Sequence, residues 1–212
     1  GTDTLISIES VLGSDFDDYI RGSDNVNTRQ FLAGDAGNDT IDGGAGIDFA
    51  NYSDVSLVLG GLNAFIENGS GTVNDKKGGT DTLINIEGLA GTHVNDTLTG
   101  GLGDQWFRGN GGSDSINGGA GNDWVSYSGD PSGVTINLGA GTATDGWNGP
   151  GGLLALGGTD TLTSIENAEG SDYDDTLTGG DGEEILEGRD GNDSINGAGG
   201  SDTILGGDGN DH

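Results

Sequence analysis

The chain has 212 residues, 47 of them glycine, and carries 36 Asp and Glu against six Lys and Arg, so its formal net charge is −30. This balance makes nucleic acid a poor partner, because phosphates are bound mainly by Lys and Arg. Cysteine is absent, which excludes disulfides and thiolate metal sites, and no apolar stretch approaches the ~20 residues of a membrane-spanning helix. An acidic chain with few apolar residues should not collapse unaided, so something cationic must stabilise it.

A long period divides the chain. The segment Gly-Thr-Asp-Thr-Leu occurs at 1–5, 79–83 and 158–162, and an Ile-Glu pair follows each occurrence. We therefore predict three tandem copies, which span 1–78, 79–157 and a shortened 158–212. Because the chain starts without Met and ends at His212 inside a repeated unit, we expect it to be a piece of a longer polypeptide.

A period of nine residues runs inside each copy, over 13–51, 91–126 and 170–212. Glycine occupies the first, second and fourth places, aspartate the sixth and an apolar residue the eighth. Six turn-forming residues then precede a three-residue strand whose middle side chain points inward. Such strands become stable when many stack in parallel, ~4.8 Å apart, over a shared core. The eighth places that would form this core are Ile20, Leu32, Ile41, Ala50, Leu98, Phe107, Ile116, Val125, Leu177, Leu186, Ile195 and Ile204.

The connecting segments 52–78 and 127–157 lack the nine-residue register. Residues 132–138 alternate between apolar and polar, which predicts a half-buried strand. In copy one the same role is predicted for Val55, Leu57 and Leu59. We expect these short strands to extend or cap the stack without forming a separate domain.

In such a solenoid the sixth-place aspartates form columns along the stacked turns. Two carboxylates ~5 Å apart repel by about 1 kcal/mol even in water, and more when partly buried. Carboxylate and backbone carbonyl oxygens are the ligands that Ca²⁺ prefers, whereas Mg²⁺ demands tighter octahedral geometry. Zinc is disfavoured, because the chain has two His and no Cys. We predict Ca²⁺ ligands at Asp18, Asp39, Asp48, Asp96, Asp114, Asp123, Asp175, Asp193, Asp202 and Asp211.

Two units carry the pattern most clearly: Gly-Asp-Ala-Gly-Asn-Asp-Thr-Ile-Asp at 34–42 and Gly-Gly-Ala-Gly-Asn-Asp-Trp-Val-Ser at 118–126. They resemble the Gly-Gly-x-Gly-x-Asp-x-apolar-x repeat of RTX (repeats-in-toxin, hemolysin-type) proteins. The resemblance implies an all-β fold, a right-handed parallel β-roll with two units per coil and calcium between turns stacked on the same edge. It also implies a bacterial protein that is secreted in one step and folds on meeting extracellular calcium.

If each unit stacks on the next but one, the sequence ranks the calcium sites. The strong pairs are Asp18 with Asp39, Asp96 with Asp114, Asp175 with Asp193, and Asp193 with Asp211. On the other edge Gln30, Gln105 and Glu184 take the sixth place and would face Asp48, Asp123 and Asp202. An amide has no charge, so we predict weaker sites beside the two glutamines, while Glu184 can bind through its longer side chain.

The Gly-Thr-Asp-Thr-Leu segments are interpreted as degenerate units. Their sixth places hold Asp3, Asp81 and Asp160, and a second set of acids follows at Glu9, Glu87 and Glu166. Two interpretations stay open for these residues. They bind further calcium ions, or they are acids of solvated turns.

The aromatic residues admit a structural and a binding interpretation. Tyr52 and Tyr127 recur at matching places, which favours a structural role. Trp124 is at a seventh place, which should point outward, and Trp147 lies in a loop. Exposed tryptophans stack on sugar rings or form interfaces. Because the sequence shows no regular aromatic array, we favour the interpretation that these residues and Trp106 cover the edges of a thin core.

These features favour a non-catalytic, calcium-binding module of a secreted protein, extracellular or at the bacterial cell surface, in a monomeric fragment. The alternative is a glycan- or surface-binding segment of an adhesin, or an appendage of a polysaccharide-modifying enzyme. Catalysis within the chain is disfavoured, because it contains neither the His-Glu-x-x-His signature of metalloproteases nor the Gly-x-Ser-x-Gly nucleophile elbow.

Overall fold

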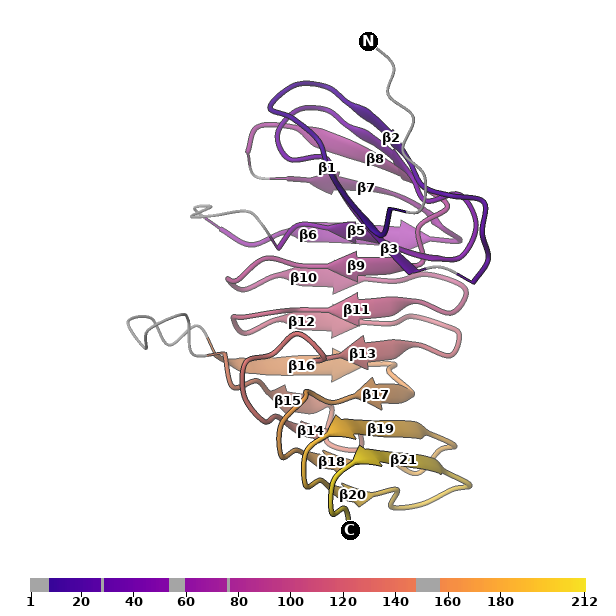
Figure 1. Cartoon of the computed structure of the whole chain (residues 1–212), viewed down its shortest axis with the longest axis vertical. Helices are drawn as coiled ribbons and strands as arrows, with labels where there is room; N and C mark the ends of the chain where they lie inside the picture. The colour runs from indigo at the N-terminus through magenta and orange to yellow at the C-terminus, as the bar shows by residue number, and fades with distance from the viewer. Residues whose placement is uncertain (1–7, 28, 54–59, 76, 148–156) are drawn as a thin grey trace.

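The computed structural model describes residues 8–27, 29–53, 60–75, 77–147 and 157–212, and in these ranges its regular elements are all β-strands. These residues accordingly include no helix long and apolar enough to cross a membrane. The strands form two sheets (Figure 1). The nine-stranded sheet has the order β1 (Ser10–Leu12), β3 (Arg29–Ala33), β5 (Ile47–Asn51), β9 (Gly88–Ala90), β11 (Trp106–Arg108), β13 (Trp124–Ser126), β17 (Asn167–Glu169), β19 (Ile185–Asp190) and β21 (Thr203–Asp208). The twelve-stranded sheet has the order β2 (Tyr19–Arg21), β4 (Thr40–Asp42), β8 (Thr80–Ile84), β7 (Ser70–Asn74), β6 (Asn63–Glu67), β10 (Thr97–Thr99), β12 (Ser115–Asn117), β16 (Thr159–Thr163), β15 (Thr142–Thr144), β14 (Thr135–Asn137), β18 (Thr176–Thr178) and β20 (Ser194–Asn196).

Within the repeat blocks the chain alternates between the two sheets, so that two successive units make one coil. Strand β10 pairs in parallel with β12, and Leu98 is aligned with Ile116. Strand β11 pairs in parallel with β13, and Phe107 is aligned with Val125. The coils lie one above the other along the long axis of the molecule (Figure 1). The structure therefore confirms the predicted all-β fold, a β-roll solenoid of nonapeptide units.

The core lies between the two sheets and is formed by the eighth places. Most repeat strands have three residues, of which the middle one is apolar, so one side chain per strand points inward. Ten of the twelve predicted core residues are buried. Ile195 is partly buried against the same cluster. The prediction was wrong for Ile204, which is 48% exposed because it lies on β21, the edge strand of its sheet.

The connecting segments insert strands into the twelve-stranded sheet. The first insertion adds β6 and β7, which form an antiparallel meander with β8, the strand of the Gly-Thr-Asp-Thr-Leu unit that follows. The outer strands of this meander pair in parallel with the coils on either side, β8 with β4 and β6 with β10. The second insertion adds β14 and β15, which form the same meander with β16 between β12 and β18.

Of the two strands predicted in these segments, one can be compared with the structure. The strand expected at 132–138 is confirmed as β14. Val55, Leu57 and Leu59 lie outside the described residues. The described counterpart of β14 in the first insertion is instead β6, because each of them pairs in parallel with the strand that begins the next repeat block. The insertions thus extend the twelve-stranded sheet from within, and they do not cap the stack.

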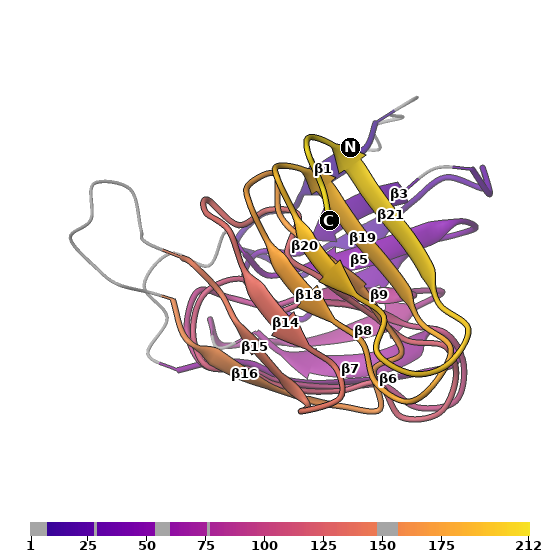
Figure 2. The ribbon, with the colours of Figure 1, turned by 90° about the horizontal axis from the view of Figure 1, so that it is seen from below.

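The insertions enlarge one sheet and leave the other unchanged. The nine-stranded sheet passes directly from β5 to β9 and from β13 to β17, while the opposite sheet holds two additional strands at each of these positions. Successive coils therefore cannot remain parallel. In Figure 1 the first coils are inclined to those around β9–β13, and Figure 2 shows from below how the stack winds about its long axis.

Candidate metal-binding turns

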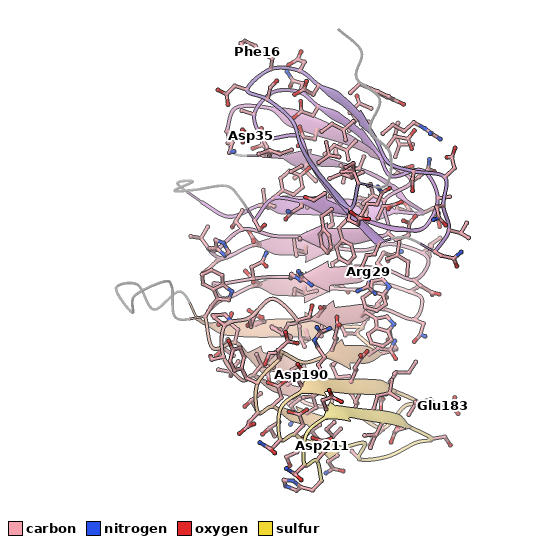
Figure 3. All side chains as sticks on the ribbon, viewed as in Figure 1. Phe16, Arg29, Asp35, Glu183, Asp190 and Asp211 are labelled. Atoms are coloured by element: carbon pink, nitrogen blue, oxygen red, sulfur yellow. The ribbon has the colours of Figure 1, made fainter. Side chains whose placement is uncertain are left out.

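The glycine-rich turns form two columns on opposite edges of the stack. Turns that lead into the twelve-stranded sheet lie on what we call the first edge, and turns that lead into the nine-stranded sheet lie on the second edge. Asp35, in a first-edge turn, and Glu183, in a second-edge turn, lie on opposite sides of the molecule (Figure 3). Most sixth-place residues immediately precede a strand, and Gln30 and Asp48 are the second residues of β3 and β5, so their backbones lie in the register of the sheet.

On the first edge, the structure brings together all four of the pairs ranked as strong. In each pair the backbone N–H of one aspartate donates a hydrogen bond to the Oδ1 atom of the aspartate one coil later. The N–O distances are 2.8 Å for Asp18–Asp39, 2.8 Å for Asp96–Asp114, 2.8 Å for Asp175–Asp193 and 3.1 Å for Asp193–Asp211. One carboxylate oxygen therefore fixes the register of neighbouring turns, and the other is left for a different partner.

That second oxygen is buried and unpaired in the interior of the column. The Oδ2 atoms of Asp39, Asp114 and Asp193 have no hydrogen-bond partner among the described residues, and these side chains are at most 2% exposed. Leaving one buried polar atom unsatisfied costs about 1–3 kcal/mol, and more when it is charged. A column of such atoms fits a bound cation, because Ca²⁺ takes carboxylate oxygens as ligands.

The first-place glycine of each turn makes room for this carboxylate. A Cβ atom on Gly34 would collide with the Oδ2 atom of Asp39, and a Cβ on Gly109 would collide with that of Asp114. The carboxylate therefore folds back over the backbone of its own turn, where carbonyl oxygens are available. The repeated glycine is thus required by close approach as well as by turn geometry.

The electrostatics of the column disfavour the charged form of these acids. Burial raises the pKa of Asp39 and Asp193. Burial, together with the charge of Asp160, raises the pKa of Asp114 to about 9. A cation bound to these oxygens would reverse the effect, since an opposite charge stabilises the carboxylate.

The second edge forms a similar column of mixed composition. The backbone N–H of Gln105 donates to Asp123 Oδ1 at 2.8 Å, and that of Glu184 donates to Asp202 Oδ1 at 3.2 Å. Both carboxylate oxygens of the fully buried Asp48 lack a hydrogen-bond partner in the described part of the chain. Burial raises the pKa values of Asp48 and Asp123 to about 6, and in each case a nearby glutamate adds to the shift.

The side-chain amide of Gln30 forms hydrogen bonds with backbone groups through both its oxygen and its nitrogen. Its Oε1 atom accepts a hydrogen bond from Ser23 N at 2.6 Å, and its Nε2 atom donates to the carbonyl oxygen of Ile8 at 2.6 Å. Both polar atoms of the amide therefore have hydrogen-bond partners in the protein. Gln105 differs, since its Oε1 atom is buried with no partner among the residues described. The weaker binding expected beside both glutamines stays a prediction, with this physical basis at Gln30.

Two acids of the degenerate units, Asp81 and Asp160, lie inside the stack. Asp81 and Asp160 are fully buried, so the interpretation as solvated turn acids was wrong for both. The Oδ1 atoms accept hydrogen bonds from Asp39 N and Asp114 N, at 3.1 and 2.9 Å. The Oδ2 atoms accept hydrogen bonds from the hydroxyls of Tyr52 and Tyr127, at 2.9 and 2.7 Å, which supports the structural role expected for the tyrosines. Asp3 lies outside the described residues.

The second set of acids divides between surface and column. Glu9 is exposed. Glu87 Oε2 accepts a hydrogen bond from Asp48 N at 3.1 Å, and Glu166 Oε2 accepts one from Asp123 N at 2.9 Å. These two glutamates thus continue the second-edge column, and they take the place that a sixth-place aspartate has in a regular unit.

A further ladder at the fifth places was missed in the sequence. There the side-chain oxygen of one residue accepts the backbone N–H of the fifth-place residue one coil later. The donor and acceptor are Asn38 and Asp17 at 2.9 Å, Ser113 and Asn95 at 3.0 Å, Asn122 and Asp104 at 2.9 Å, and Asn192 and Asp174 at 2.7 Å. Hydrogen bonds from the backbone of Asn38 and Asn192 lower the pKa values of Asp17 and Asp174. The signal was the recurrence of Asn or Asp at the fifth place.

Aromatic side chains also form a stacked array, which the sequence analysis did not expect. On the nine-stranded sheet Phe31 stacks on Phe49 with ring centroids 4.9 Å apart, and Trp106 stacks on Trp124 at 4.4 Å. The guanidinium of Arg29, labelled in Figure 3, lies 4.4 Å from the centroid of the Trp106 ring and links the two pairs. Because these rings stack on one another and are at most partly exposed, the array supports the structural interpretation.

The turns do not hold a metal by side chains alone. Across the described ranges, no group of three or more His, Asp or Glu side chains is arranged so that it could bind a metal ion by itself. A site here must combine the paired carboxylates with backbone carbonyls of the turns. This donor set suits Ca²⁺, which accepts six to eight oxygen ligands in flexible geometry.

Comparison with known proteins gives one family. A family model of the RTX calcium-binding nonapeptide repeat matches the chain in four copies, at residues 31–50, 94–129, 154–192 and 178–212. Together these segments cover more than half of the chain and include every predicted calcium ligand except Asp18. No curated protein matches the chain.

Proposed function

Because the chain belongs to the RTX calcium-binding nonapeptide repeat family, and so is a calcium-binding module of the kind found in secreted bacterial proteins, we propose that its coils fold when calcium binds between stacked turns. The observation that supports this most directly is the row of buried, unpaired Oδ2 atoms at Asp39, Asp114 and Asp193. Each lies in a turn that is already in register with its neighbour.

The proposed ligands are the ten sixth-place aspartates, with carbonyl oxygens of the same turns. On the first edge they act in the four pairs that the hydrogen bonds bring together. On the second edge Asp48, Asp123 and Asp202 bind with Glu87, Glu166 and Glu184 as the acids closest to them in the column. The bound cations neutralise part of the charge of the 36 Asp and Glu side chains, which six Lys and Arg side chains cannot balance.

Calcium binding and folding are coupled in this proposal. Without the ion, the columns place carboxylates close together in buried turns, and the repulsion opposes the narrow apolar core. With the ion, its binding energy becomes folding energy, since the unfolded chain has no preformed site. The chain would then remain unfolded in a calcium-poor cytoplasm and become ordered outside the cell. The module is structural in this proposal and performs no catalysis.

The three tandem copies are part of the same proposal. Their support is that both insertions add two strands at corresponding positions of the coil, β6 and β7 in the first and β14 and β15 in the second. Their hydrogen bonds also correspond, since Asp39–Asp81–Tyr52 in the first matches Asp114–Asp160–Tyr127 in the second.

Circular dichroism tests the proposal. The chain is measured in chelator, in excess calcium and in excess magnesium at equal ionic strength. We expect β-structure in calcium, a disordered spectrum in chelator and little recovery in magnesium. A chain that is equally ordered in chelator and in calcium would contradict the proposal.

A further inference from the structure

In each insertion an aspartate follows the last inserted strand. It accepts hydrogen bonds from the backbone of the loop that leads back into the stack, and we call it the cap of that loop. Asp75 directly follows β7, and its Oδ1 atom accepts hydrogen bonds from the backbone N–H groups of Lys77, Gly78 and Gly79, at 2.9, 3.1 and 2.8 Å. The capping carboxylate is therefore held in a single orientation by three donors.

The second insertion repeats this cap in a longer loop. Asp145 directly follows β15, and its Oδ1 atom accepts hydrogen bonds from Trp147 N at 3.3 Å and Gly158 N at 2.8 Å. The glycine that is capped lies thirteen residues after Asp145, whereas Gly79 lies four residues after Asp75. Two loops of different length thus place an aspartate at the same point of the coil.

The second carboxylate oxygen of both caps is buried and unpaired. The Oδ2 atoms of Asp75 and Asp145 have no hydrogen-bond partner in the described structure. The side chains are 0% and 6% exposed. These atoms are in the same condition as the Oδ2 atoms of the repeat turns, although Asp75 and Asp145 lie outside every nonapeptide unit.

The capped loops stack directly on repeat turns of the first edge. A Cβ on Gly79 would collide with the carbonyl oxygen of Gly37, and a Cβ on Gly158 would collide with that of Gly112. Lys77 also forms an ion pair with Asp35 in the neighbouring repeat turn. The loop of each insertion is therefore the next level of the first-edge column, after the turns that contain Asp39 and Asp114.

Electrostatic contacts agree with this placement. Burial is the main cause of the raised pKa of Asp39, and the charge of Asp75 contributes to it. Burial and Asp160 raise the pKa of Asp114, and the charge of Asp145 contributes as well. Each capping carboxylate therefore acts on the unpaired carboxylate one level away.

In a regular column, the unpaired carboxylates of Asp39 and Asp114 would each face a free carboxylate at the next level, but here that carboxylate already has a hydrogen-bond partner. The sixth-place acids of the next level, Asp81 and Asp160, direct their Oδ2 atoms to the hydroxyls of Tyr52 and Tyr127. Asp39 and Asp114 consequently lose the free carboxylate that a regular turn would provide. Asp75 and Asp145 supply an unpaired oxygen at the level where it is missing.

We propose that each insertion carries a further divalent-cation site that nonapeptide repeats do not encode, formed by Asp75 with Asp39 in the first and by Asp145 with Asp114 in the second. Carbonyl oxygens of the two stacked turns complete the ligand set, and Ca²⁺ is the cation that this set fits best. The inference rests on the proposed function, because it assumes that the regular turns bind calcium. Its consequence is that the first-edge column continues through both insertions without a gap.

The second insertion also contains a further buried acid and a surface pocket. The Oδ2 atom of Asp130 is also buried and without a partner among the residues described. Burial raises the pKa of Asp130 to about 8, and the charge of Asp145 adds to the shift. A surface pocket of about 420 Å³ lies beside Asp145, with Gly158 and Ser113 also in its lining.

Counting bound ions tests this inference. Wild type, Asp75→Asn, Asp145→Asn and the double variant are compared in excess calcium by native mass spectrometry. Asparagine keeps the Oδ1 acceptor of the cap and removes the charge. Each single variant should bind one ion fewer than wild type and the double variant two fewer. The matched control is Asp15→Asn/Asp190→Asn, which removes two exposed carboxylates and should lose no ion.

The two hypotheses fail in different ways. A wild-type chain that binds no calcium would contradict the proposed function. A wild type that binds calcium and a folded double variant that retains all its ions would overturn the further inference alone.

Terbium luminescence gives a test that does not depend on how the aspartate variants fold. The backbone N–H of Trp147 donates a hydrogen bond to Asp145 Oδ1. Excitation of the Trp147 indole should therefore sensitise a Tb³⁺ ion in the second site. Trp147→Phe should lose a distinct part of the emission. Equal emission from wild type and Trp147→Phe would overturn the second site.

Discussion

The backbone N–H of Asp114 donates a hydrogen bond to the Oδ1 atom of Asp160 at 2.9 Å, although the two residues are 46 positions apart in the chain. In a regular coil the corresponding aspartates are separated by 18 positions. The column of acids on the first edge therefore passes through the second insertion as if the inserted strands were absent. Asp114 lies inside this column, with Asp96 one level before it and Asp160 one level after it.

Asp114→Asn should weaken calcium binding without destabilising the calcium-free folded chain. Loss of one charged ligand is expected to raise the calcium concentration at half-folding by on the order of tenfold, which corresponds to about 1.4 kcal/mol. In chelator the variant should be no less stable than wild type, because burial disfavours the charged form of Asp114 and the asparagine amide carries no charge. Circular dichroism during calcium titration measures both effects. Asp190→Asn, on an exposed carboxylate, is the control, and an equal shift in both variants would contradict the prediction.

Gly109→Ala should weaken the same turn without changing its charge. The new Cβ would collide with the Oδ2 atom of Asp114 and displace the carboxylate from its place over the turn. We expect a rise in the calcium midpoint of several-fold, since a displaced ligand costs about 1 kcal/mol or more. The control is Gly199→Ala, where the nearest atom to the new Cβ is Asp181 Oδ1 at 3.5 Å. A midpoint that changes no more in Gly109→Ala than in the control would refute the steric argument.

The repeat blocks could be predicted from sequence because one residue in each unit decides its orientation. Ile41 or Leu98 is the single apolar side chain of a three-residue strand, so only one register buries it. The same logic aligned Asp96 with Asp114 one coil later, because identical units stack on identical units. In these blocks the nine-residue sequence pattern therefore predicts both which side chains are buried and which units stack on one another.

The insertions could not be predicted in the same way. Their strands run antiparallel, and the order β8-β7-β6 in the sheet is the reverse of the order in the chain, which no residue period encodes. Asp75 and Asp145 were missed because they lie at different distances in sequence from the glycines they cap. Asp160 was recognised as a sixth-place residue, but its hydrogen bond to Tyr127 depends on how the insertion folds.

The pH dependence of the calcium-free chain should be opposite to that of most acidic proteins. Burial raises the folded-state pKa of Asp114 to about 9 and those of Asp48 and Asp123 to about 6, from a usual value of 3.8. The folded state therefore binds these protons more tightly than the unfolded state. The stability they contribute is complete below the unfolded-state pKa and is lost as the pH rises through 6 and then 9.

Circular dichroism in chelator checks this order. We expect more β-structure at about pH 5 than at about pH 8. Calcium binding should show the reverse trend and weaken in acid, since protons compete for the same oxygens. If β-structure in chelator increases with pH, the buried carboxylates do not control the stability of the calcium-free chain.

Tyr127→Phe should destabilise the folded chain even when calcium is saturating. The Tyr127 side chain is fully buried, and its hydroxyl donates to Asp160 Oδ2 at 2.7 Å. Phenylalanine keeps the packing of the ring but leaves a buried carboxylate oxygen without a donor, which costs about 1–3 kcal/mol. Urea unfolding in excess calcium measures the loss, and Tyr173→Phe, on a ring that is 49% exposed, should leave the midpoint unchanged. Equal stability of Tyr127→Phe and wild type would mean that Asp160 Oδ2 has another partner. The first candidate would be the calcium ion proposed beside Asp114, because the freed oxygen lies at the level where Asp145 is proposed to act.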